Sequence, residues 1–217
     1  MNICIMAGGP SQYWPNLHMY KQRANLWVGV DRGVLALLEQ GITPHLSVGD
    51  FDSVTKDEFQ MMQAQLPEVS LFPSEKDETD LELALNWAIG QKPKNIYIFG
   101  ATGGRIDHFL GNIQLLQQEA VLHCLDEVNI YIIDEKNSVT IKKPGTYDIQ
   151  YDSKKKYFSL LSVTKEVTGI TLTGFKYPLH QARLTRGSTL CISNELISEY
   201  GNVSFEKGII MMVRSND

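Results

Sequence analysis

The sequence has few cysteines, no long hydrophobic run and no excess of positive charge. Its three cysteines, Cys4, Cys124 and Cys191, are widely spaced and form no C-x-x-C pair, which argues against a disulfide framework and a zinc knuckle. Apolar runs such as residues 209–213 are far shorter than the ~20 residues of a membrane span, and residues 1–6 lack the basic start of a signal peptide. We therefore expect a cytoplasmic, globular protein without a membrane partner.

Acidic residues outnumber basic ones and are concentrated in the first half of the chain. The 217 residues include 20 Lys and Arg against 25 Asp and Glu, whereas a general nucleic-acid binder would carry a basic excess. Residues 1–125 hold 8 basic and 14 acidic residues, and residues 126–217 hold 12 and 11. No nucleic-acid partner is expected, and the candidate chemistry lies in the acidic first half.

The pattern of apolar residues changes near residue 127. Before this point, short apolar runs alternate with helical stretches, which predicts a parallel α/β sheet. After it, glycine-punctuated runs predict an all-β domain, with strands at 129–133, 138–141, 146–151, 157–163, 169–172, 189–193, 201–206 and 208–213. We expect an α/β domain with a mainly parallel, Rossmann-like sheet at 1–126 and an all-β sandwich or barrel at 127–217.

Four acidic motifs follow strands or open helices in the first half. They are Asp31 in Val-Asp-Arg-Gly, Asp50 and Asp52 in Gly-Asp-Phe-Asp-Ser, Asp77 and Asp80 in Lys-Asp-Glu-Thr-Asp, and Asp107 in Gly-Gly-Arg-Ile-Asp-His. In open α/β sheets, ligands bind beyond the carboxyl ends of the strands. Carboxylates without nearby His or Cys suit a hard cation such as Mg²⁺, which keeps substrate phosphates among its other ligands.

The acidic motifs also have purely structural interpretations. Asp52 could cap a helix or form an Asx turn. Asp77 could be the N-cap of a helix at 78–89, with Asp80 completing a capping box. These interpretations do not exclude ligand binding, because helix N-termini favour phosphate groups.

Three further segments are ambiguous on the sequence alone. Residues 100–105 could approach phosphate through their glycines and Arg105, or form a tight strand-to-helix turn. His108 fits a structural hydrogen-bonding role better than that of a base. By composition, the run Ser193-Asn194-Glu195 is an ordinary turn.

Taken in order, the motifs resemble those of bacterial members of the thiamine pyrophosphokinase (thiamine diphosphokinase) family. In the first half the matching segments are Met6-Ala7-Gly8-Gly9, Val30-Asp31-Arg32-Gly33, Gly41-Ile42-Thr43-Pro44, Gly49-Asp50-Phe51-Asp52-Ser53, Lys76-Asp77-Glu78-Thr79-Asp80-Leu81-Glu82, Gly100-Ala101-Thr102-Gly103-Gly104-Arg105-Ile106-Asp107-His108 and Asn112. In the second half they are Gly174-Phe175-Lys176-Tyr177-Pro178-Leu179, Ser193-Asn194-Glu195 and Phe205-Glu206-Lys207-Gly208. Each motif is modest alone, but the ordered set is specific and spans most of the chain.

The resemblance implies a fold, a partner arrangement and a reaction. The fold is an α/β nucleotide-binding domain followed by a β-sandwich, in a homodimer with thiamine bound near the subunit interface. The enzyme would transfer the diphosphate of ATP to the hydroxyl of thiamine by Mg²⁺-assisted in-line attack on the β-phosphorus, giving thiamine diphosphate and AMP. An acidic cleft suits thiamine, because thiamine carries a fixed positive charge.

The candidate residues take roles in that reaction. The metal ligands would be Asp50, Asp52, Asp77 and Asp80, and the catalytic residues Asp52, Asp80, Arg105 and Asp107. Contacts to ATP or thiamine would come from Asp31, Asp77, Thr79, Gly103, Gly104, Arg105, Asp107, Ser193 and Asn194. The base for the attacking hydroxyl would be an aspartate of the cluster, which the sequence does not single out.

Other functions remain compatible with the same acidic motifs. A related diphosphokinase could act on another alcohol, such as a hydroxymethylpterin. A metal-dependent phosphohydrolase would release phosphate without an acceptor, and a non-catalytic sensor would bind thiamine or a nucleotide without forming AMP. The nature of the products distinguishes these classes.

Overall fold

The computed structural model describes residues 1–51, 54–66, 70–71 and 77–217, and it divides into two compact units. The N-terminal unit is Met1–Glu135 and the C-terminal unit is Lys136–Asp217. Strand β6 (Asn129–Ile133) belongs to the first unit, because it pairs in parallel with β5 (Asn95–Phe99).

The N-terminal unit is an α/β structure whose strands pair in parallel. Its other strands are β1 (Asn2–Met6), β2 (Leu26–Val30), β3 (Leu46–Gly49) and β4 (Ser70–Leu71), and the order across the sheet is β6-β5-β1-β2-β3-β4. Ile5 of β1 pairs with Val28 of β2 and Ile98 of β5. All the strand pairs of this unit are parallel, which confirms the predicted Rossmann-like sheet.

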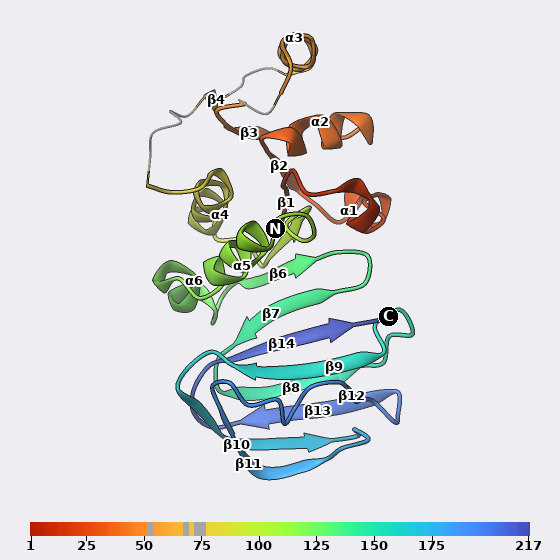
Figure 1. Ribbon diagram of the computed structural model, residues 1–217, viewed down its shortest axis with the longest axis vertical. Coiled ribbons are helices and arrows are strands. Elements are labelled where there is room, and N and C mark those ends of the chain that lie inside the picture. Colours follow the sequence, from red (N-terminus) through yellow and green to blue (C-terminus); the bar gives the residue numbers. More distant parts are fainter. Residues whose placement is uncertain (52–53, 67–69, 72–76) are drawn as a thin grey trace. The chain divides into compact units, whose positions relative to one another are not determined.

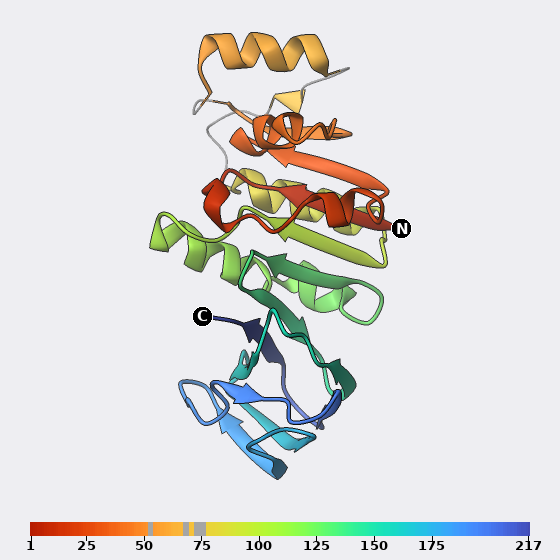
Figure 2. The same cartoon turned by 90° about the vertical axis from the view of Figure 1, so that its right-hand side faces the viewer.

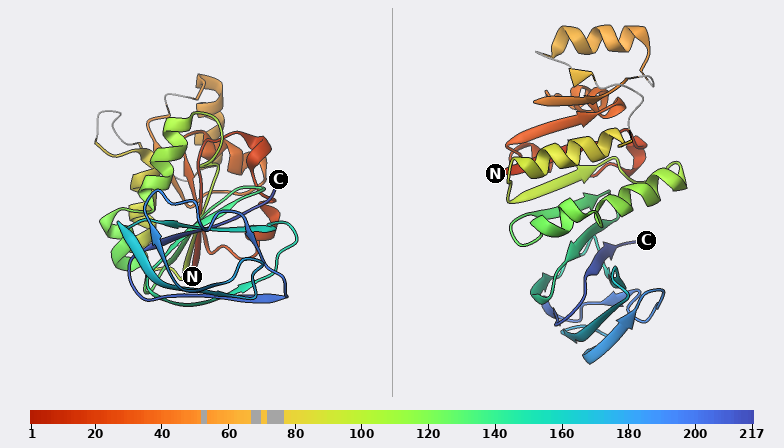
Figure 3. Two further views of the ribbon diagram at one scale, coloured as in Figure 1. Left: turned by 60° about the horizontal axis from the view of Figure 1, so that its bottom comes forward. Right: turned by 90° about the vertical axis from the view of Figure 1, so that its left-hand side faces the viewer.

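Helices cover both faces of this sheet. They are α1 (His18–Lys21), α2 (Arg32–Glu39), α3 (Lys56–Gln65), α4 (Asp80–Gly90), α5 (Ile106–Leu115) and α6 (Glu119–Cys124), with a short 3₁₀ turn at Ser11–Tyr13. Figure 1 shows α1 and α2 on the opposite side of the sheet from α4 and α5. Figure 2 is viewed from the side of α1 and α2, and the right-hand view of Figure 3 is from the side of α4 and α5. The apolar strands are therefore buried on both faces, as parallel sheets require.

Two predicted helices differ from the structure at their ends. The helix predicted at 78–89 begins at Asp80, and its N-cap is Thr79 rather than Asp77, because Thr79 Oγ1 accepts a hydrogen bond from the Glu82 backbone N–H at 3.2 Å. The helix predicted at 106–122 is interrupted after Leu115 and resumes at Glu119. Apolar periodicity locates helices but does not fix their caps.

The C-terminal unit is an antiparallel β-sandwich. Its strands are β7 (Ser138–Lys142), β8 (Gly145–Gln150), β9 (Tyr157–Ser162), β10 (Glu166–Thr173), β11 (Leu179–Thr185), β12 (Asn194–Glu195), β13 (Tyr200–Phe205) and β14 (Ile210–Ser215). One layer has the order β12-β9-β14-β7 and the other β11-β10-β13-β8. All strand pairs within these layers are antiparallel, which confirms the predicted sandwich.

The core of the sandwich lies between its two layers. Phe158 and Leu160 of β9, Val203 of β13 and Ile210 of β14 are each at most 1% exposed. The Phe158 and Phe175 rings lie 5.0 Å apart between centroids, within the range of favourable aromatic pairs. Among the described residues, no helix is long and apolar enough to cross a bilayer.

Candidate functional site

The candidate site lies at the carboxyl ends of the parallel strands. Asp31 directly follows β2, Asp50 directly follows β3, and the loop that starts at Gly100 follows β5. A cavity of about 890 Å³ opens at this edge of the sheet, within the N-terminal unit. Its lining comes from strand ends, from the start of α4 and from α5, and comprises Ala7, Val30, Asp31, Asp50, Glu78, Thr79, Asp80, Leu81, Glu82, Asp107, His108, Gly111, Asn112, Gln114, Leu115, Gln117 and Gln118.

Three carboxylates converge in the cavity. Asp31, Asp50 and Asp80 each present an oxygen, and these three oxygens lie within 4.8 Å of one another. All three residues are half-buried. Negative charges held this close repel one another unless a cation lies between them. The donor set is all carboxylate oxygen, which fits Mg²⁺ or another hard cation.

Strained backbone holds the first two of these carboxylates. Asp31 has φ 48° and Phe51, next to Asp50, has φ 57°, in a region that side chains other than glycine rarely occupy. Each such residue costs of order 1–3 kcal/mol and persists only where its surroundings hold it. Gly49 makes the arrangement possible, because a Cβ there would lie 2.1 Å from Asp31 Oδ1.

The start of α4 supplies the third carboxylate. Thr79 caps the helix and Asp80 is its first residue, so the helix N-terminus, with its partial positive charge, borders the cavity. Asp77 is exposed and does not line the cavity. Asp52, the other predicted metal ligand of this region, lies outside the described residues.

The glycine-rich loop after β5 is braced by the segment that follows β1. The Gly9 N–H donates to the Gly100 carbonyl at 2.8 Å, and the Trp14 indole N–H donates to the Gly9 carbonyl at 2.8 Å. Gly103 has φ 80°, and a Cβ there would lie 2.4 Å from the Tyr13 ring. The loop thus forms the predicted strand-to-helix turn, with Gly103 packed against Tyr13, and its predicted approach to phosphate stays a prediction.

Arg105 and Asp107 form a bidentate pair at the end of this loop. Arg105 Nε donates to Asp107 Oδ1 at 3.1 Å, and Nη2 donates to Oδ2 at 2.5 Å. Hydrogen bonding from Arg105, then from the His108 N–H, lowers the pKa of Asp107 to about 2. Asp107 is therefore ionised near neutral pH and is a weak proton acceptor. Both side chains are more than half exposed, so the guanidinium can be reached by a ligand.

Two polar residues that line the cavity received no role from the sequence, although Glu82 lies in a matching segment. Glu82 of α4 and Gln118 line the cavity together, and Gln118 Nε2 donates to Glu82 Oε1 at 2.6 Å. Polar residues on helices are common, and no spacing in the sequence distinguishes these two. Asn112, part of a matching segment, lines the cavity and donates to the Ala101 carbonyl at 2.8 Å.

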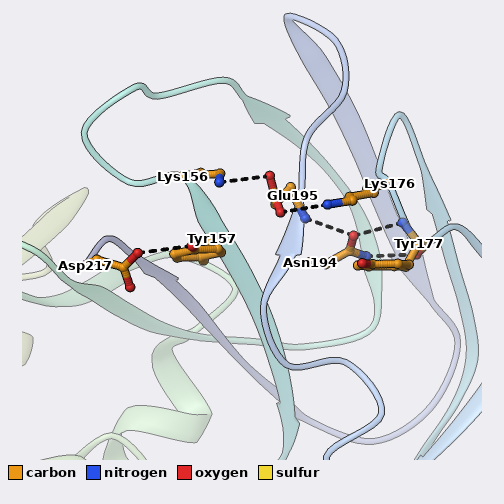
Figure 4. A network of polar contacts seen from close by, with 7 residues as sticks. All are labelled: Lys156, Tyr157, Lys176, Tyr177, Asn194, Glu195 and Asp217. Carbon is orange, nitrogen blue, oxygen red and sulfur yellow. Dashed lines mark hydrogen bonds and ion pairs between the residues drawn. The ribbon is translucent and has the colours of Figure 1, made fainter.

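The two predicted residues of the C-terminal unit differ sharply from each other. Ser193 is exposed and has φ 57°, while Asn194 is 4% exposed. Figure 4 shows Asn194 in a network with Tyr177, Glu195 and neighbouring charged residues. The Glu195 carboxylate lies 3.4 Å from Lys156 Nζ and 3.1 Å from Lys176 Nζ, and these two lysines lower the pKa of Glu195.

The structure thus brings part of the predicted site together. Asp31, Asp50, Thr79, Asp80 and Asp107 line one cavity. Gly103, Gly104 and Arg105 are exposed and do not line the cavity, but they lie on the loop that leads to Asp107. An α/β sheet with carboxylates at the carboxyl ends of its strands is typical of enzymes that bind phosphate compounds through a divalent cation.

Comparison with known proteins identifies the family. Residues 17–128 match the model "Thiamin pyrophosphokinase, catalytic domain" and residues 146–210 match "Thiamin pyrophosphokinase, vitamin B1 binding domain". The thiamine pyrophosphokinase of Bacillus subtilis is 47% identical over 215 residues, covering 99% of each chain. Its crystal structure superposes with a TM-score of 0.93 over 100% of both chains. A thiamin pyrophosphokinase family protein from Enterococcus faecalis is 34% identical, with a TM-score of 0.90 over 100% of both chains.

The chain belongs to the thiamin pyrophosphokinase family, whose members are ATP-dependent transferases. It is therefore an enzyme. The resemblance, the two-part fold and the enzyme class predicted from the sequence are all confirmed.

Proposed function

We propose that this enzyme is a thiamine diphosphokinase, which transfers the diphosphate of ATP to the hydroxyl of thiamine and releases AMP. The convergence of Asp31, Asp50 and Asp80 in a cavity at the strand ends is the observation that carries the mechanism. A phosphoryl-type transfer needs positioning and charge neutralisation more than covalent help. In-line attack of the thiamine oxygen on the β-phosphorus fits such a site.

Asp50 and Asp80, with Asp31, would hold Mg²⁺. Asp52 and Asp77 were predicted from the sequence to share this role and remain candidates. When bound, Mg²⁺ would neutralise phosphate charge and act as a Lewis acid towards the transferred group. Thr79, at the start of α4, would place backbone N–H groups near the phosphates.

The loop after β5 would contact the transferring group. Arg105 has a planar fork suited to phosphate oxygens, and Gly103 and Gly104 allow the backbone to approach them closely. Asp107 would hold that fork in position in the absence of substrate. A carboxylate with a pKa of about 2 makes a poor general base, so another aspartate of the cluster would accept the hydroxyl proton.

Thiamine would bind to the C-terminal unit through the surface around Ser193 and Asn194. The match of residues 146–210 to a vitamin B1 binding domain supports this placement. The segment predicted at 1–126 would bind ATP and Mg²⁺. The segment predicted at 127–217, of which strand β6 pairs with the first unit, would bind thiamine. A homodimer with thiamine near the subunit interface, acting in the cytoplasm, completes the proposal.

The test is an end-point assay with purified protein, ATP, Mg²⁺ and thiamine, read by nucleotide chromatography. We expect AMP and thiamine diphosphate in equal amounts, and no AMP when thiamine is left out. ADP or free phosphate would indicate a kinase or a phosphohydrolase instead. Binding of thiamine without any AMP would indicate a sensor. If AMP forms only with another alcohol, such as a hydroxymethylpterin, the proposal of thiamine as the acceptor is wrong, but the proposal of diphosphate transfer from ATP holds.

A further inference from the structure

The side chain of Asn194 makes three hydrogen bonds inside the C-terminal unit. Its Oδ1 accepts hydrogen bonds from the Tyr177 N–H at 3.0 Å and from the Glu195 N–H at 2.9 Å, and its Nδ2 donates to the Tyr177 carbonyl at 2.8 Å (Figure 4). The residue is 4% exposed. These bonds use both acceptor sites and one of the two N–H groups of the amide, and the burial of the residue limits access to the other N–H.

Asn194 connects two segments that are far apart in the sequence. The first is the turn at Lys176 and Tyr177, whose Lys176 N–H also donates to the Glu195 carbonyl at 2.8 Å. The second is the turn that ends in Ser193, whose N–H donates to Ser159 Oγ at 2.9 Å. The Asn194 amide is the only side chain shown to bond both the N–H and the carbonyl of Tyr177 among the described residues. Its side-chain bonds add to the backbone bridge between Phe175 and Leu196, and together they set how the first turn lies against the second.

The hydrogen bonds of Asn194 lie next to a residue with strained backbone, Ser193. Ser193 has φ 57°, a conformation that serine seldom adopts, and the residue is exposed. Strained residues persist where the surrounding structure over-determines them, and they gather at ligand sites. The three hydrogen bonds of Asn194 and the bond from Ser193 N–H to Ser159 supply that constraint.

We propose that Asn194 is a positioning residue of the thiamine-binding surface: its buried amide fixes the Ser193 and Tyr177 turns relative to each other and does not touch the ligand. This inference rests on the proposed function and deepens it, because that proposal lets Asn194 contact thiamine directly. Ser193 is then the group that meets the ligand, and Asn194 acts through it.

The test compares thiamine KM, ATP KM and kcat for single and double variants. Asn194→Ala should raise the KM for thiamine about tenfold, the size expected when one polar contact is misplaced. The KM for ATP and kcat should stay within about twofold, because the ATP site lies in the other unit. Asn202→Ala is the matched control, since it removes the Asn202–Asp148 hydrogen bond in the same unit. It should leave the KM for thiamine unchanged.

The direction in which Asn194→Asp changes the thiamine KM distinguishes a positioning residue from a residue that contacts thiamine. The aspartate keeps both acceptor bonds but cannot donate to the Tyr177 carbonyl when ionised, so the thiamine KM should rise. If residue 194 touched thiamine, a new negative charge beside the cation would lower that KM. A lowered KM in Asn194→Asp overturns the proposal. This variant keeps two of the three bonds and also serves if Asn194→Ala does not fold.

The double variant Ser193→Ala/Asn194→Ala tests whether the two residues act as one. If Asn194 acts through Ser193, the Ser193→Ala change should add less than about twofold once Asn194 is alanine. If Ser193→Ala raises the thiamine KM by the same factor with Asn194 present as with alanine at position 194, the two residues act independently, which overturns the inference. Failure of the proposed function is distinct, because the unaltered protein would then form no AMP with thiamine.

Discussion

Replacing Gly49 with alanine should disable the carboxylate cluster without removing any carboxylate. An added Cβ would lie 2.1 Å from Asp31 Oδ1 and 3.0 Å from Asp31 Cγ. Non-bonded heavy atoms prefer a separation of about 3.5 Å, so the Asp31 carboxylate must move by more than about 1 Å. Gly49 also has φ 149°, which alanine accommodates poorly.

The size of the effect follows from the geometry of the cluster. The three oxygens lie within 4.8 Å of one another, and Mg²⁺ requires ligands at about 2.0–2.1 Å in near-octahedral geometry. A misplacement of about 1 Å at a reacting site costs on the order of 100-fold in rate. We expect kcat/KM for Gly49→Ala to fall about 100-fold, and the Mg²⁺ concentration that gives half the maximal rate to rise roughly tenfold.

The assay follows AMP formation against Mg²⁺ concentration at fixed ATP and thiamine, well below the Tm of each variant. Gly90→Ala is the control, because nothing lies within 4 Å of a Cβ at that position. In an Asp31→Ala background the clash is gone, so Gly49→Ala should add less than about threefold. Wild-type turnover and Mg²⁺ dependence in a folded Gly49→Ala protein would refute the reasoning. A full further loss in the Asp31→Ala background would place the cause in the backbone instead of Asp31.

Four other predictions concern the same unit. Arg105→Lys should lower kcat by at least about tenfold, since a point charge cannot replace a bidentate fork, and an unchanged kcat would exclude the phosphate role. The carboxyl of Asp107, followed by NMR, should titrate near 2 in the unaltered protein and closer to 3.8 in Arg105→Gln. Because its pKa is lowered, Asp107 loses its charge, and its pairing with Arg105, only as the pH falls towards 2, and it should cause no inflection in a rate profile between pH 6 and 9. Thr79→Ala should reduce the unfolding free energy by about 1 kcal/mol in a urea titration, and Thr79→Ser should not. Asp52→Asn should keep the fold and abolish most turnover, and near-native activity would remove Asp52 from the metal role.

The sheet and the strand-end aspartates were predictable because each follows from a local pattern. Apolar runs followed by Asp31 and Asp50 place those residues at one edge as soon as the strands are parallel. The register brings them close, since Val30 of β2 pairs with Val48 of β3. The third carboxylate, Asp80, was also predicted, but the start of its helix was not, because α4 is capped by Thr79 and not by the neighbouring Asp77.

The C-terminal unit was less predictable in its details. A strand predicted at 189–193 is mostly a turn, and β12 occupies only Asn194–Glu195. Strand β11 was missed because only Leu184 among its residues is buried, so it lacks the alternation of a half-buried strand. The buried Asn194 amide was also invisible, since its partner Tyr177 lies 17 residues away in sequence.

The sequence did not predict the strained backbone at either candidate site. Asp31, Phe51 and Ser193 all have positive φ, and none is a glycine, the residue from which this conformation would be predicted. Local propensity disfavours each of them there, so only tertiary contacts explain their state: the Asp31 N–H donates to the Val48 carbonyl at 2.9 Å, and the Ser193 N–H donates to Ser159 Oγ. A sequence reports which carboxylates and hydroxyls are available. Lys92 and Gln181 also have positive φ, so strain alone does not identify a site; at Asp31 and Ser193 it coincides with a candidate ligand group, whose loss should change catalysis or binding more than stability.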